Sequence, residues 1–81
     1  MADVRTRGLA RLMLRWPGKR ADLARKFRED ARFGELCEAY EAACTAVDYW
    51  SRSDAAVAPA RMAEYRALVS ATEEDIFARI C

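Results

Sequence analysis

The chain has no histidine, asparagine or glutamine among its 81 residues. Without histidine, a cysteine or serine nucleophile lacks its usual base. The acidic residues that a metal site in a helical bundle would use are present (Glu38, Glu41, Glu73, Glu74 and Asp75), but the Glu-x-x-His pairs of such sites cannot form. No G-x-x-x-x-G-K-[ST], G-x-G-x-x-G or G-x-S-x-G motif occurs either. We therefore predict that the protein is not an enzyme and has no cofactor or metal.

Long apolar runs are also missing, because every stretch of more than six residues contains a charged side chain. No segment can therefore span a bilayer. The three cysteines are an odd number, which is ordinary in a reduced protein. Cys37 and Cys44 lie seven residues apart, so on one helix their Cα atoms are about 10 Å apart, too far for a disulfide. These features predict a cytoplasmic protein without a membrane span.

Glycine and proline are scarce, at three and two residues, whereas alanine is frequent. This composition favours helices and predicts an all-α fold. Charge divides the chain: residues 1–32 carry ten Arg and Lys against four Asp and Glu, and residues 33–81 carry four against nine. We expect one small domain over 1–81, with basic N-terminal helices over 1–29 and an acidic helical hairpin over 30–81.

Two short helices are expected in the basic part. The first covers about 3–16, where an apolar stripe recurs at helical spacing and Pro17 ends the helix; the stripe consists of Leu9, Leu12, Met13 and Trp16. The second covers about 19–29. Asp30 suits the N-cap of the next helix, but no proline separates 19–29 from 31–50, so one long helix is an alternative.

The acidic part predicts an antiparallel hairpin of helices at about 31–50 and 59–80. Apolar residues recur at three and four residues along both segments, as in helices that pack on each other; they are Phe33, Leu36, Cys37, Tyr40, Cys44, Val47 and Trp50, then Met62, Tyr65, Val69, Thr72 and Ile76. Pro59 fits the first turn of the second helix. A turn centred near residue 54 would place Cys44 opposite Tyr65 and Cys37 opposite Thr72.

The apolar face of 59–80 is wider than one partner helix would cover. Leu68 lies to one side of the seam, and Phe77 and Ile80 lie to the other. The first helix, a second chain or both must cover this surface. With Trp16 and Tyr49, these residues form the candidate interface. They predict a protein-interaction or assembly module whose partner is a second copy, as a homodimer, or another protein.

The basic helices offer a second function. Arg7, Arg11 and Arg15 recur every four residues, and Arg20 follows. Arginine binds phosphate well, so these four are candidate contacts to nucleic acid or another anionic surface. The same arginines could instead pair with the acidic hairpin of their own chain, and the sequence leaves both possibilities open.

Residues 30–80 also carry a resemblance. The patterns Asp30-Ala31-Arg32-Phe33-x-x-Leu36-Cys37-x-x-Tyr40, Glu64-Tyr65-Arg66-x-Leu68 and Glu73-x-x-Ile76-x-x-x-Ile80 resemble small uncharacterised proteobacterial helical-hairpin proteins and, more distantly, hairpins of the YdcH type. The resemblance implies a bacterial cytosolic hairpin and supplies no catalytic residues.

Overall fold

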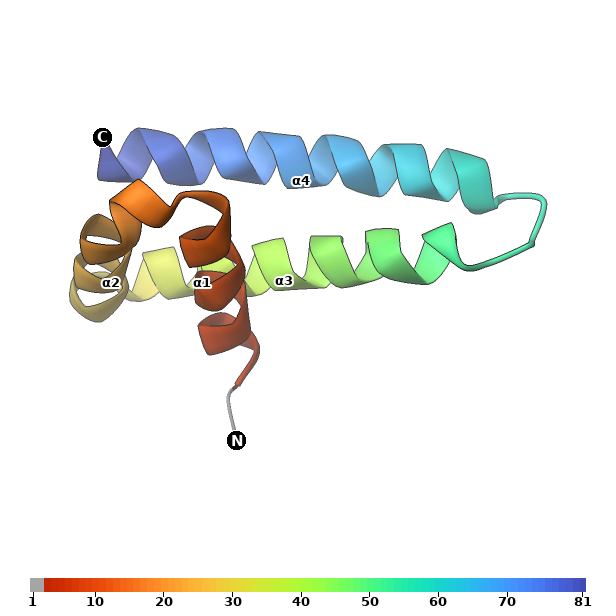
Figure 1. The fold of residues 1–81 in the computed structure, drawn as a ribbon. Coiled ribbons are helices and arrows are strands. Elements are labelled where there is room, and N and C mark those ends of the chain that lie inside the picture. Colours follow the sequence, from red (N-terminus) through yellow and green to blue (C-terminus); the bar gives the residue numbers. More distant parts are fainter. Residues whose placement is uncertain (1–2) are drawn as a thin grey trace.

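The computed structural model describes residues 3–81, and every regular element within them is a helix. The order is α1 Val4–Arg15, the 3₁₀ helix η1 Pro17–Lys19, α2 Arg20–Glu29, α3 Ala31–Ser51 and α4 Ala58–Ile80. The predicted all-α fold is confirmed. In Figure 1, α3 and α4 form a long antiparallel hairpin, and α1 crosses the half of it away from the loop. The end opposite the loop is covered by α2 and is called the closed end below.

The boundaries of α1 and α4 follow from local chemistry. Asp3 caps α1, because its carboxylate accepts a hydrogen bond of 2.8 Å from the N–H of Thr6. Trp16 leaves the helical conformation before Pro17, as expected of a residue that precedes proline. Pro59 lies in the first turn of α4, where its missing N–H costs no helical hydrogen bond.

Asp30 separates α2 from α3, which settles the alternative of one long helix. Its backbone is extended, with φ −137° and ψ 108°, and its carboxylate accepts a hydrogen bond of 2.9 Å from the N–H of Arg32. The cap satisfies a donor at the start of α3 that has no partner within the helix. The chain therefore turns at Asp30, and α2 can cover the closed end of the hairpin.

The core lies where the four helices meet. Its fully or almost fully buried side chains come from every helix: Leu12, Leu23, Phe33, Cys37, Tyr40 and Ile76. Gly8 lets α1 approach α3 closely, because a Cβ atom there would overlap the carbonyl oxygen of Cys37. The main cluster of the core thus lies in the half of the hairpin away from the loop, and the loop half extends beyond α1 (Figure 1).

The pairing of α3 with α4 differs from the expected one by about one helical turn. The Tyr40 hydroxyl donates a hydrogen bond of 2.7 Å to Glu73, and Cys44 shares a depression with Val69 and Ser70 instead of lying opposite Tyr65. The register depends on how the side chains of the two helices interlock, and the contact of Tyr40 with Glu73 is part of that packing.

Candidate interaction surface

The basic helix α1 docks on the acidic hairpin of its own chain. Arg5 lies 3.1 Å from Glu38 and Arg11 lies 2.5 Å from Glu41, both on α3. Arg15 lies 3.5 Å from Glu73 on α4, and Arg11 also lies 3.9 Å from Asp48. The charge asymmetry along the sequence is therefore used in part within the molecule.

The pair Arg11–Glu41 is the most buried of these contacts. Glu41 is only 8% exposed, and it accepts a second hydrogen bond of 3.3 Å from the Thr45 hydroxyl. A buried carboxylate is costly without such partners. Across residues 3–81, no buried side-chain nitrogen or oxygen lacks a hydrogen-bond partner. The sequence pattern did not identify Glu41 as buried, because its polarity resembles that of a solvated helix position.

A second polar cluster joins α1, α3 and α4 around Glu73. The Glu73 carboxylate accepts the hydrogen bond from Tyr40 and lies near Arg15, and its side chain is 19% exposed. Burial and this hydrogen bond raise the pKa of Tyr40 well above its ordinary value. Tyr40 is therefore a neutral donor at physiological pH and helps to hold α3 against α4.

The four arginines proposed for anionic partners do not share one environment. Arg11 and Arg15 are engaged with carboxylates of the hairpin. Arg7 and Arg20 are exposed, and none of the ion pairs found over residues 3–81 involves either of them. The predicted stripe of Arg7, Arg11 and Arg15 therefore does not act as one surface: two of its arginines pair with the hairpin, and Arg7 faces solvent.

The cysteines are unpaired. Burial raises the pKa of Cys37 to about 11 and also raises that of Cys44. Because the thiolate is the reactive form, both thiols are weak nucleophiles at neutral pH. Cys81 is exposed at the end of the chain. No group of three or more Cys, Asp or Glu side chains among the described residues converges on a possible metal site.

One flank of α4 is partly covered by the chain itself. The rings of Trp16 and Phe77 meet edge to face with centroids 5.1 Å apart, and the ammonium group of Lys19 lies 5.9 Å from the centre of the Phe77 ring. Ile80 packs against the edge of the core. An open depression of about 550 Å³ remains beside Trp16 and Phe77. Of the predicted interface, these three residues are thus partly used by intramolecular packing.

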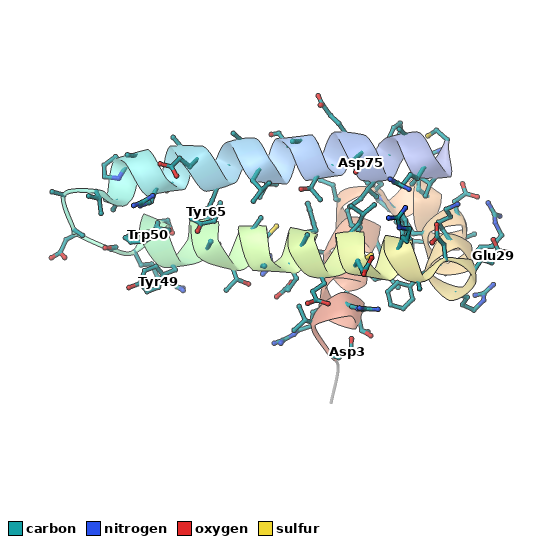
Figure 2. All side chains as sticks on the ribbon, turned by 180° about the vertical axis from the view of Figure 1, so that it is seen from behind. Asp3, Glu29, Tyr49, Trp50, Tyr65 and Asp75 are labelled. Carbon is teal, nitrogen blue, oxygen red and sulfur yellow. The ribbon has the colours of Figure 1, made fainter. Side chains whose placement is uncertain are left out.

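The opposite flank of α4 is uncovered. Leu68 is 49% exposed on the side of α4 away from Arg66, Ser70 and Phe77, which border the depressions next to α1. Figure 2 shows this face of the hairpin: α1 lies behind it, α2 lies at its right end, and no other helix crosses the remainder. Tyr65 points from α4 toward α3, and Trp50 lies next to it. The apolar face of α4 is therefore wider than the chain covers, as the sequence indicates: Leu68 is exposed on this flank, and Phe77 is still 40% exposed on the other.

Tyr49 lies on neither flank of α4 but on the surface of α3. It is 61% exposed on α3, where its ring meets Trp50 edge to face at 5.0 Å and borders a shallow depression of about 630 Å³ with Val4 and Arg7. Sequence reasoning missed Leu14, which is 76% exposed on α1. Its position outside the stripe of Leu9, Leu12, Met13 and Trp16 was the available signal.

Comparisons with family models, with curated proteins and with solved structures yield no match to this chain. The resemblance to YdcH-type hairpins therefore stays a prediction. Within residues 3–81, no helix combines the length and the apolar character needed to cross a membrane.

Proposed function

We propose that the protein is a non-catalytic protein-interaction or assembly module of the cytoplasm. The observation that carries this proposal is the bare face of the hairpin, which carries Leu68, 49% exposed, and lies opposite the face on which α1 packs. Leu68 and the exposed Ala67 and Ala71 beside it form an apolar patch that charged side chains rim, which is typical of interaction surfaces. The unpaired cysteines support a reducing compartment.

The environment of the titratable groups supports a role without catalysis. Glu41 and Glu73, the two least exposed carboxylates with partners on other helices, are engaged with Arg11 and Tyr40. The buried thiols are held in the protonated form. The carboxylates therefore serve the packing of helices, and the protonated thiols are weak nucleophiles.

Affinity purification with a matched pair of variants tests this proposal. Leu68→Glu and Leu14→Glu each place a carboxylate at an exposed leucine, and only the first alters the bare face. We expect the wild-type chain and Leu14→Glu to retain bound protein, either untagged copies or another protein, and Leu68→Glu to lose at least nine-tenths of it. Equal retention by all three chains would contradict the proposal.

Binding to nucleic acid or another anionic surface is the second candidate, favoured by the exposed and unpaired Arg7 and Arg20. The test is binding to a labelled random-sequence duplex and single strand at low and moderate salt. Arg7→Glu with Arg20→Glu should weaken binding and lower the slope of log affinity against log salt by about 1.8, since each phosphate contact contributes about 0.9. Arg52→Glu with Arg66→Glu makes the same charge change elsewhere. If both pairs behave alike, this site is excluded.

A further inference from the structure

We propose that a second copy of the chain covers the bare face, with the two α4 helices packed antiparallel and Leu68 on the twofold axis. This inference rests on the proposed interaction function and names the partner. On α4, one stripe of exposed residues is spaced by three, four or seven positions, so that its members share one side of the helix. In order, the stripe consists of Arg61, Glu64, Leu68, Asp75 and Arg79.

The charges of this stripe are symmetric about Leu68. Arg61 lies seven residues before Leu68 and Asp75 lies seven residues after it. Each distance along the helix is about 10.5 Å. In an antiparallel pair centred on Leu68, Arg61 of one copy therefore lies at the height of Asp75 of the other, and the twofold axis repeats the pair at the other end.

The neighbouring charges extend this match. Within the chain, Arg61 lies 3.3 Å from Glu64, and Arg79 lies 3.2 Å from Asp75. At each end of the antiparallel pair, the order would be Glu64, then Arg61 beside Asp75 of the other copy, then Arg79 of that copy. The signs alternate along this row. A parallel pair would instead place Arg61 beside Arg61 and Asp75 beside Asp75, and like charges oppose association.

The shape of α4 permits a close approach. Ala60, Ala67 and Ala71 are exposed beside the stripe, and small side chains let helix axes approach to about 8 Å. Leu68 of each copy is then the apolar centre of the contact, and Tyr65 points away from it toward α3 (Figure 2). The four helices of two hairpins would thus form a bundle.

Charge reversal gives a sharp test of this arrangement. Arg61→Glu puts two carboxylates opposite each other at both ends of the contact, and Asp75→Arg puts two guanidinium groups there. Each variant alone should raise the dimer dissociation constant at least tenfold. An equimolar mixture restores opposite charges at both ends, so we expect mixed dimers with an affinity within about threefold of wild type. Leu68→Glu should remove self-association, and Leu14→Glu should not.

Sedimentation velocity with reductant, up to 500 µM protein, measures these affinities, and differently labelled chains report mixed dimers. Reductant is needed because Cys81 is exposed. Circular dichroism checks that each exposed substitution leaves the helices folded. We expect the mass to rise with concentration from 9.2 kDa toward twice that value.

Three outcomes would overturn the inference: a wild-type monomer over the whole range, a dimer insensitive to Leu68→Glu, or single-charge variants that do not recover on mixing. A monomer that still retains another protein through Leu68 would overturn only the self-association and leave the proposed function standing. Loss of that retention as well would overturn both.

Discussion

Replacing Gly8 by alanine is the sharpest test of how α1 is placed on the hairpin. Gly8 is buried in the middle of α1, and its added Cβ would overlap the carbonyl oxygen of Cys37, a backbone atom that cannot rotate away. Overpacking of this kind costs about 1–3 kcal/mol and occasionally more. The gain in helix propensity from glycine to alanine is only about 0.5–1 kcal/mol. Because the overlap is severe and involves backbone, we expect a cost at the upper end of this range and a net loss of about 2 kcal/mol.

Two other glycines provide controls with the opposite sign. A Cβ at Gly34 would meet only the flexible side chain of Arg5, at 3.4 Å, and a Cβ at Gly18 would meet nothing within 4 Å. Neither glycine has a positive φ. Alanine at either position should therefore leave stability unchanged or raise it by up to about 1 kcal/mol, through helix propensity and a less flexible unfolded chain.

Thermal and urea unfolding followed by circular dichroism measures all three variants. A domain of this size shifts its Tm by about 4–8 °C per kcal/mol, so Gly8→Ala should melt about 8–16 °C below wild type. Gly34→Ala and Gly18→Ala should melt at or above the wild-type temperature. If Gly8→Ala is as stable as the two controls, α1 does not cross α3 at Gly8 and the placement of the core is refuted.

Other perturbations probe the polar contacts. Arg11→Ala leaves Glu41 buried without its charged partner and should lower the free energy of unfolding in urea by about 2–3 kcal/mol. Arg5→Ala breaks an exposed ion pair and should lower it by less than about 1 kcal/mol. Equal losses of stability in the two variants would contradict this difference in burial. Asp30→Ala removes the cap of α3 and should cost about 1 kcal/mol, with an unchanged urea midpoint arguing against the cap. Burial raises the pKa of Cys37 from 9.0 to about 11; because the folded state favours the protonated thiol, about 2–3 kcal/mol of stability is present below pH 9 and is lost as the pH rises to 11. Urea midpoints at pH 8 and 11 in reductant should fall more for wild type than for Cys37→Ala, and parallel falls would show that this thiol is not the cause.

The helices themselves were readable from the sequence, since periodicity and caps are local. The apolar spacing from Phe33 to Trp50 and Pro59 in its first-turn position correctly predicted the hairpin. Asp30 was recognised as a cap, although only the folded chain shows that it also ends α2. The pairing of α3 with α4 was missed by about a turn, because contacts such as Tyr40 with Glu73 depend on how whole helices dock.

The candidate surface was only partly predictable for the same reason. Sequence position assigns Leu68 and Phe77 to two flanks of α4, but it does not say which flank α1 will cover. The close crossing at Gly8 and the burial of Glu41 depend on tertiary packing. The spacing of a single glycine or glutamate within a helix does not predict either feature. The three candidate places around Leu68, Tyr49 and Trp16 therefore separate only in the folded molecule.

Docking of α1 on the hairpin also changes what the charge asymmetry means for association. Arg11 and Arg15 form ion pairs with Glu41 and Glu73 of the same chain. The positive charge of the N-terminal part and the negative charge of the hairpin therefore partly cancel within the molecule. The whole chain carries a net charge of only +1, so two copies meet with little long-range repulsion. The choice of orientation is then left to short-range charges at the contact, and on α4 those are Arg61 and Asp75, placed symmetrically about Leu68. The two charge-reversal variants prefer mixed dimers because like charges repel each other in their homodimers, and salt screens this repulsion. Raising the salt concentration should therefore reduce the preference for mixed dimers by a larger factor than it reduces the affinity of the wild-type dimer.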